Sequence, residues 1–177
     1  SFLTLNNTGK YLLLEPHSKN YPSYIEDVLF QLKESGFNPI LAHPERNKIL
    51  RKNPSEIYKL VQSGILMQVT AGSILGHHGK RLKNFSRHLL DHELVHFIAS
   101  DAHHYTRRKF ELIEAYEFIE QNYSSTYREY LQTNAINVVE GKEIKIITPK
   151  YIEKRRQYFF FYNHPLNQIR AKNINIF

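Results

Sequence analysis

Short apolar segments alternate with longer amphipathic segments along most of the chain, and this alternation constrains the fold more than any other feature. The segments typical of buried strands are residues 10–15, 38–43, 65–70 and 94–100. The segments with apolar residues at helical spacing are residues 21–36, 53–64, 79–93, 108–123 and 124–141. Strands and helices that alternate through short connections are typical of a parallel sheet with helices packed outside it. The sequence therefore predicts an α/β fold.

Polar residues follow three of the predicted strands at the point where each strand ends. They are Glu15, His43 and, in the sequence "SDAH", Asp101 and His103. The carboxyl ends of parallel strands lie at one edge of a sheet, so these four side chains are expected to converge there. Carboxylates and imidazoles without a cysteine suit zinc, manganese or iron, which predicts a metal site. A histidine at a strand end is also commonly a structural residue, and for His43 that alternative stays open.

Arg46 lies three residues after His43, in the sequence "LAHPERN". A guanidinium is planar and permanently charged, and it binds phosphate or carboxylate through two parallel hydrogen bonds. We therefore expect Arg46 to bind an anion next to the metal site. The alternative is a surface ion pair with Glu45 or Asp27.

A glycine-rich loop, "AGSILGHHGKR", lies between the third predicted strand and the helix that follows. Free backbone N–H groups at the start of that helix, at Gly79 and Lys80, are expected to bind phosphate. Adjacent side chains in a loop seldom bind one ion together, so His77 and His78 are expected to be lining or surface residues. Three further histidines are expected to be structural: His88, His92 and His96.

The chain has 24 Lys and Arg against 17 Asp and Glu, a net charge of +7. This charge would suit a phosphorylated or nucleic-acid partner. Much of the excess lies after residue 149, however, so the rest of the chain is only mildly basic and a nucleic-acid partner is not expected. No apolar run reaches the roughly 20 residues that span a bilayer, and no signal peptide is visible, which predicts a cytoplasmic protein without membrane insertion.

Three motifs occur in order along the chain: "LAHPERN", "VTAGSILGHHGKR" and "HFIASDAH". Together they resemble the polymerase-and-histidinol-phosphatase (PHP) superfamily, and more narrowly its bacterial protein-tyrosine phosphatases of capsule and exopolysaccharide synthesis. The resemblance runs from about residue 3 to residue 150. It implies a partial phosphoesterase domain over residues 1–150 and a basic, aromatic tail over residues 151–177.

The resemblance implies a distorted (β/α)7 barrel of the TIM type that holds two or three ions, commonly manganese. By motif, Glu15, His43, Asp101 and His103 resemble metal ligands, and Arg46 resembles the arginine that binds substrate phosphate. The implied catalytic residues are Arg46, Asp101 and His103. The implied reaction is hydrolysis of phosphotyrosine by a metal-bound hydroxide, with the tyrosine-rich tail of a capsule-regulating kinase as substrate.

One part of the family pattern has no counterpart in this sequence. Members begin with a strand that ends in a His-x-His pair, whereas the first histidine here is His17. The chain thus resembles the C-terminal four strands of a seven-stranded barrel with about half of the ligands. A fragment, a truncated gene product, or an assembly completed by a second copy or another chain would each explain this.

Three functions are compatible with the sequence. The first is a metal-dependent tyrosine phosphatase with impaired activity. The second is a non-catalytic homologue that binds phosphotyrosine or a partner chain. The third and weaker one is a phosphodiesterase or nuclease of the same superfamily.

Overall fold

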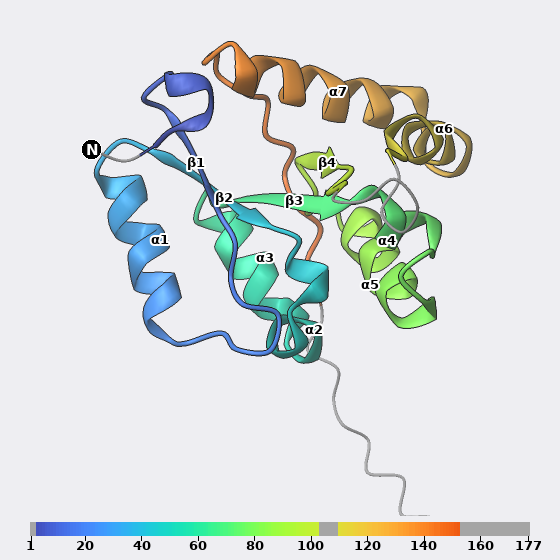
Figure 1. The fold of residues 1–177 in the computed structure, drawn as a ribbon, viewed down its shortest axis with the longest axis horizontal. Helices are drawn as coiled ribbons and strands as arrows, with labels where there is room; N and C mark the ends of the chain where they lie inside the picture. The colour runs from blue at the N-terminus through green and yellow to red at the C-terminus, as the bar shows by residue number, and fades with distance from the viewer. Residues whose placement is uncertain (1–2, 103–109, 153–177) are drawn as a thin grey trace, which may run out of the picture.

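The structure is a computed structural model, and it describes residues 3–102 and 110–152. Its centre is a four-stranded parallel sheet in the order β1-β2-β3-β4 (Figure 1). The strands are β1 (Tyr11–Leu14), β2 (Asn38–Ala42), β3 (Leu66–Thr70) and β4 (Phe97–Ala99). All four strands lie within the segments predicted from the sequence, so the α/β class with a parallel sheet is confirmed.

Helices occupy the connections between strands and the chain after β4. The α-helices are α1 (Tyr24–Glu34), α2 (Lys48–Lys52), α3 (Pro54–Gln62), α4 (Ala71–Leu75), α5 (Lys80–Asp91), α6 (Leu112–Asn122) and α7 (Ser125–Val139). Two 3-10 helices are η1 (Leu5–Asn7) and η2 (Pro44–Arg46). The sequence did not predict α2 or α4. The first part of the glycine-rich segment expected to be a loop, Ala71–Leu75, forms α4 instead, with Ala71 and Ile74 fully buried.

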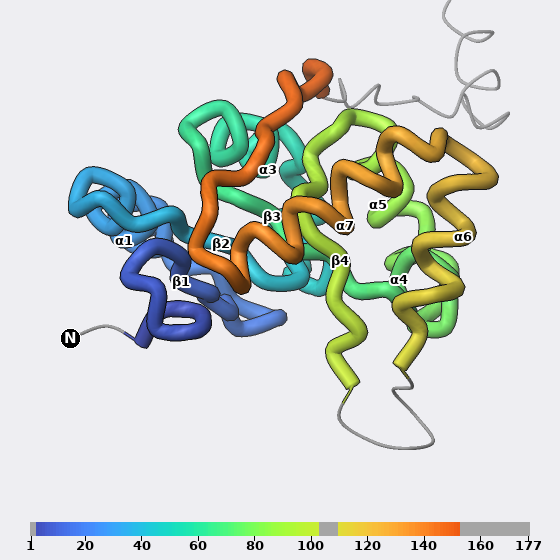
Figure 2. The backbone as a smooth tube through the Cα atoms, turned by 90° about the horizontal axis from the view of Figure 1, so that it is seen from above, coloured from blue at the N-terminus to red at the C-terminus, as the bar shows by residue number. Residues whose placement is uncertain are grey.

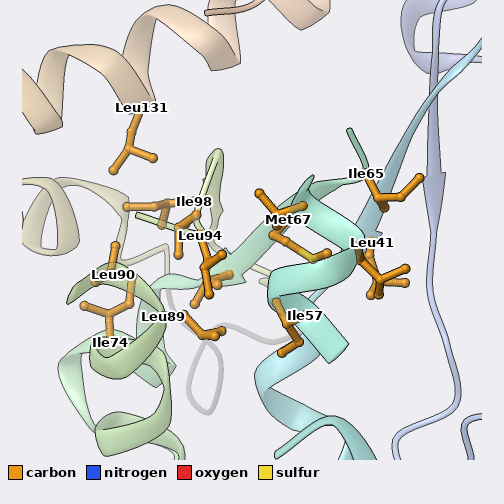
Figure 3. Close-up of a cluster of buried hydrophobic side chains, with 14 of the residues drawn as sticks. Leu41, Ile57, Ile65, Met67, Ile74, Leu89, Leu90, Leu94, Ile98 and Leu131 are labelled. Atoms are coloured by element: carbon orange, nitrogen blue, oxygen red, sulfur yellow. The ribbon is translucent and has the colours of Figure 1, made fainter. Parts of the chain in front are cut away.

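The main hydrophobic core lies between one face of the sheet and the helices. In the parallel register Leu41 of β2 pairs with Met67 of β3, so both side chains point to this face. Figure 3 shows them close to Ile57 of α3, and Leu89 of α5 belongs to the same buried cluster. The burial of both strand faces explains why these strands are continuous apolar runs in the sequence.

The other face of the sheet carries a smaller cluster. Its strand residues come from all four strands and are joined by Val138 of α7: Tyr11, Ile40, Leu66 and Phe97. Helix α7 runs beside β4 and covers that edge of the sheet (Figures 1 and 2). At the opposite edge, Leu13 of β1 lies on the same face as Tyr11 and is 45% exposed.

The described chain stays packed up to its last residue, Ile152, which is buried. Lys150 donates its backbone N–H to the His92 carbonyl oxygen at 2.9 Å. The Tyr151 ring packs edge-on against Tyr58 with ring centres 5.3 Å apart. The rest of the predicted tail, residues 153–177, lies outside the described residues, so the two-part division stays a prediction. None of the helices within residues 3–102 and 110–152 combines the length and the apolar character needed to span a bilayer.

Candidate functional site

The carboxyl ends of the strands carry the residues expected to form the site. Glu15 follows β1, His43 follows β2, and Asp101 lies two residues after β4. His43 and Asp101 both adopt left-handed backbone conformations, with φ of 33° and 50°. Such conformations are uncommon outside glycine and are retained where the surrounding structure fixes them. The backbone thus turns sharply at two of the expected site residues.

Hydrogen bonds fix the turn at His43. Its backbone N–H donates to the Gln68 carbonyl oxygen of β3 at 2.7 Å. Its own carbonyl oxygen accepts the Arg46 N–H at 2.9 Å, which closes η2. The imidazole is turned toward Glu15, with 3.1 Å between His43 Nε2 and Glu15 Oε1. The histidine side chain is 12% exposed and the glutamate side chain 72% exposed, so this pair of predicted metal ligands opens to solvent.

Arg46 and Asp101 form an ion pair between η2 and the chain after β4. Both side chains are largely buried, at 16% and 15% exposed. The Arg46 Nη1 atom donates to Asp101 Oδ2, whereas its Nη2 atom is buried and makes no hydrogen bond within the described residues. The alternative expectation of a surface pair with Glu45 or Asp27 is wrong, because the guanidinium points into the rim of the sheet.

Glu45, the neighbour of Arg46, is entirely buried. Its Oε1 atom accepts the backbone N–H of Thr70, at the end of β3, at 3.1 Å. Burial raises the pKa of the Glu45 carboxyl above its ordinary value, and the hydrogen bond from Thr70 only partly offsets the rise. Arg51 of α2 donates to the Glu45 backbone carbonyl oxygen. Glu45 therefore anchors η2 to β3.

Asn47 ends the "HPERN" motif and is buried as well. Its Oδ1 atom caps α2 by accepting the N–H groups of Ile49 and Leu50 at 2.9 and 3.1 Å. Its amide nitrogen donates to the carbonyl oxygens of His17 and Asn20, both at 3.0 Å. The Asn47 side chain thus connects the segment after β1, which follows Glu15, to the start of α2, which follows His43.

A pocket of about 450 Å³ adjoins the Arg46–Asp101 pair. Its lining residues come from η2, α2, the chain before α5, and α5: Arg46, Arg51, His78, Arg81 and Leu82. Three of the five are arginines and none is acidic. Desolvation and the nearby Arg81 lower the pKa of Arg51. The pocket is therefore strongly electropositive and suited to an anion.

The glycine-rich segment contributes His78 to the lining of this pocket, and not Gly79 and Lys80, which were the predicted phosphate-binding residues. Gly79 and Lys80 are exposed at the start of α5 and are not among the lining residues of the pocket. His78 does line it, and the Ser73 Oγ and His78 Nδ1 atoms are 3.3 Å apart. His77 instead lies 2.8 Å from Glu111, between its Nδ1 and the carboxylate Oε1. The expectation that His77 and His78 are lining or surface residues is confirmed.

The family model for capsular polysaccharide synthesis proteins, CpsB/CapC, matches residues 1–140. The chain belongs to the CpsB/CapC family. It is 39% identical over 159 residues to tyrosine-protein phosphatase YwqE of Bacillus subtilis, which covers 90% of this chain and 62% of YwqE. It is 35% identical to the putative tyrosine-protein phosphatase CapC of Staphylococcus aureus, over 86% of this chain and 60% of CapC.

A solved structure of the family has the same fold. It comes from crystal structures of YwqE from Bacillus subtilis and CpsB from Streptococcus pneumoniae, described as unique metal-dependent tyrosine phosphatases. The match has a TM-score of 0.82 at 39% identity and covers 86% of this chain and 61% of the solved one. This CpsB/CapC chain therefore spans about three fifths of the length of the relatives it matches.

The metal-binding side chains expected in this CpsB/CapC chain are only partly brought together. Within residues 3–102 and 110–152, no three His, Asp or Glu side chains lie close enough to hold one ion. Glu15 and His43 form one pair of donors, and Asp101 is paired with Arg46. His103 lies outside the described residues. The described residues thus bring together two of the expected ligands, Glu15 and His43, and not a complete set.

Sequence reasoning missed three residues of the site: Glu45, Arg51 and Arg81. Glu45 appeared in the sequence analysis only in the alternative of a surface ion pair with Arg46. The signal that could have found its burial is the apolar strand directly before the motif, since a helical turn at a strand end points one side chain back into the core. Arg51 and Arg81 lie 30 residues apart in different helices, and no spacing rule relates them.

Proposed function

We propose that this chain carries the phosphate-binding side of a metal-dependent tyrosine phosphatase site. The observation that carries the proposal is the state of Arg46. Its Nη1 atom is held by Asp101, while its buried Nη2 atom makes no hydrogen bond within the described residues and the residue lines an electropositive pocket. A buried donor without an acceptor costs roughly 1–3 kcal/mol, and a shift of the guanidinium that let a phosphate oxygen in the pocket reach this donor would recover that cost.

The residues of the chain divide between two tasks in this proposal. Glu15 and His43 would hold a divalent ion, as two members of a larger ligand set. Such an ion supplies Lewis acidity and lowers the pKa of water. Arg46, which lines the pocket, binds the phosphoryl oxygens, and Asp101 holds its guanidinium in place. Positioning the phosphate against a fixed positive charge favours the transition state, in which charge on the oxygens is redistributed.

Several finer features belong to the same proposal. They are manganese as the ion, Asp101 and His103 as further ligands or catalytic residues, and Gly79 and Lys80 as contributors to phosphate binding. They also include the distorted barrel of the PHP superfamily, a phosphotyrosine protein as substrate, and a cytoplasmic location. The family name and the relatives' names support the phosphotyrosine substrate, because those relatives are called tyrosine-protein phosphatases.

The test is hydrolysis of a phosphotyrosine peptide by the purified chain with added Mn²⁺, measured as released phosphate. Arg46→Ala is expected to lower kcat/KM about 100-fold, as removal of one charge-stabilising donor does in other enzymes. Arg128→Ala is the matched control, because it removes an arginine from an exposed ion pair with Glu120 on the far helices. Equal activity of wild type and Arg46→Ala would contradict the proposal.

A second measurement tests the metal-binding pair directly. Titration of the chain with Mn²⁺, followed by calorimetry, is expected to show binding that weakens in His43→Ala and in Glu15→Gln. The histidine variant is expected to lose more, because its side chain is more buried. Unchanged titrations in both variants would remove Glu15 and His43 from the metal site.

A non-catalytic function is the second candidate, and one observation favours it. Within the described residues the expected ligands make only one pair, Glu15 with His43. A chain of this kind would bind the phosphopeptide through Arg46 without turnover. The same assay separates the two functions, since peptide binding that depends on Arg46 without phosphate release would favour the non-catalytic one.

A further inference from the structure

The pocket beside Arg46 holds more positive charge than one phosphoryl group requires. Arg46 already has Asp101 as its counter-ion. Arg51 and Arg81 add two more guanidinium groups to the same wall, and neither forms an ion pair with a carboxylate in residues 3–102 or 110–152. The excess of charge is therefore local to the part of the pocket that α2 and α5 form.

The backbone brings these two arginines together against electrostatic repulsion. Helices α2 and α5 both contact η2, and each presents one arginine to the pocket. Desolvation and, after it, the nearby charge of Arg81 lower the pKa of Arg51, whereas Glu45 raises it. The contribution of Arg81 reflects the repulsion between the two positive charges. Arg51 is held in place by its hydrogen bond to the Glu45 carbonyl oxygen, so it does not turn away to relieve the repulsion.

The shape of the pocket agrees with a ligand larger than a phosphate. Its volume of about 450 Å³ lies within the range of roughly 300–1,000 Å³ that small organic ligands occupy. Leu82 gives it one apolar wall, and His78 adds a ring that can donate or accept a hydrogen bond. A carboxylate on a short methylene stem matches this lining, with the charged end on the arginines and the stem on Leu82.

We propose that Arg51 and Arg81 form a second anion subsite, which binds the carboxylate of a glutamate or aspartate next to the phosphotyrosine in the substrate. Arg46 takes the phosphoryl group, and the subsite selects acidic flanking sequence. The inference rests on the proposed phosphatase function for the identity of the first group, the phosphotyrosine. It names the class of substrate: an acidic phosphopeptide.

The test compares three fluorescein-labelled peptides of one length by fluorescence anisotropy, at about 0.15 M ionic strength where distant charges are screened. The first has phosphotyrosine flanked by glutamates, the second has phosphotyrosine flanked by glutamines, and the third has unphosphorylated tyrosine flanked by glutamates. Glutamine has the shape of glutamate without its charge. Wild type is expected to bind the first peptide about tenfold more tightly than the second, the gain typical of one charge-assisted hydrogen-bonded pair.

Variants then locate the preference. Arg81→Ala is expected to reduce the glutamate preference to twofold or less while leaving the affinity for the glutamine-flanked phosphopeptide within about twofold. Arg81 is exposed on α5, so the fold does not depend on it. Arg51→Ala is expected to act in the same direction, and its circular dichroism spectrum checks that the lost bond to Glu45 has not unfolded α2. Arg81→Lys is expected to restore part of the preference, because it keeps the charge without the planar fork.

Lys52→Ala is the matched control, since Lys52 is an exposed cation next to Arg51 on α2 and does not line the pocket. A glutamate preference that survives in both arginine variants, or one lost equally in Lys52→Ala, would overturn the subsite. The third peptide separates this inference from the proposed function. If phosphorylation adds no affinity but the glutamate preference still depends on Arg81, the subsite stands and the phosphatase proposal fails. If no peptide binds wild type, both fail.

Discussion

Arg46 and Asp101 lie 55 residues apart in the chain and form a largely buried ion pair at the carboxyl ends of β2 and β4. Asp101 was expected to be a metal ligand, and Arg46 a phosphate-binding residue. In the structure the two are partners. The Asp101 carboxylate therefore orients the Arg46 guanidinium. A metal ion bound to Asp101 would have to displace Arg46 or bind the same carboxylate beside it.

This ion pair is expected to contribute measurably to stability. Asp101→Ala leaves the Arg46 guanidinium partly buried without its partner, so the free energy of unfolding should fall by about 2 kcal/mol. A double-mutant cycle with Arg46→Ala, followed by urea unfolding, isolates the coupling between the two side chains. The pair of Arg128 and Glu120 is the control, because its side chains are 34% and 43% exposed and its coupling should stay below about 0.5 kcal/mol. Equal coupling in both pairs would contradict the buried geometry.

Glu45 is expected to make the protein less stable as the pH rises. Burial raises the pKa of its carboxyl in the folded state above the ordinary 4.5, so the folded state binds the proton more tightly than the unfolded state. The unfolding free energy of wild type relative to Glu45→Gln is therefore greatest below a pH of about 4.5. It falls as the pH rises through the higher pKa of the folded state. Urea unfolding from pH 4 to pH 8 measures the difference. Glu129→Gln, at an exposed position on α7, is the control. If the difference in unfolding free energy between wild type and Glu45→Gln did not change with pH, Glu45 would be ionised in the folded state at no cost.

His96 is expected to have the opposite effect on stability. It is buried between β3 and β4, and its Nδ1 atom accepts the Met67 N–H at 3.1 Å. Burial lowers the pKa of His96 from 6.5 to about 4. The unfolded state then binds the proton more tightly, so stability is full above pH 6.5 and is lost as the pH falls toward 4, by about 3 kcal/mol. The loss should shrink in His96→Gln, and a His96 imidazole NMR signal that titrates near pH 6.5 would contradict the assignment.

Asn47 is expected to position the chain that carries Glu15. Asn47→Ala removes an N-cap and two amide donors from a buried site, which should cost about 2–4 kcal/mol in the free energy of unfolding. Asn47→Ser keeps a capping oxygen and loses the amide donors, so about half of that loss is expected. Hydrogen exchange of residues 17–20 measures the second contribution: exchange there should quicken in both variants. Slow exchange in both would show that the Asn47 amide does not hold this segment.

Periodicity was enough to predict the sheet and most of the helices. The four apolar strand segments were found because strands buried on both faces are continuous runs of apolar residues. The five long helices were found because their apolar residues recur at helical spacing. Helices α2 and α4 were missed, since five residues give no periodic signal. Asn47 caps α2, and most of α4 is buried.

The candidate site was predictable only in its location. Polar residues at the ends of β1, β2 and β4 had to meet at one edge of the sheet, and Glu15 and His43 do so. Which of these side chains would pair with which was not predictable from the sequence. The sharp turns at His43 and Asp101 depend on left-handed backbone conformations that the surrounding contacts impose. The metal-ligand function of Asp101 and His103 stays a prediction, since Asp101 is held by Arg46 and His103 lies outside the described residues.

The sequence by itself determined the α/β class, the parallel sheet and the edge at which function gathers, because these follow from local periodicity and from the right-handed connection of strands through helices. Only the tertiary structure decided which charges meet. It buried Glu45 against Thr70, paired Arg46 with Asp101, and brought Arg51 and Arg81 into one pocket. Electrostatic energy depends on distance and burial, and the fold sets both between residues that the sequence keeps far apart.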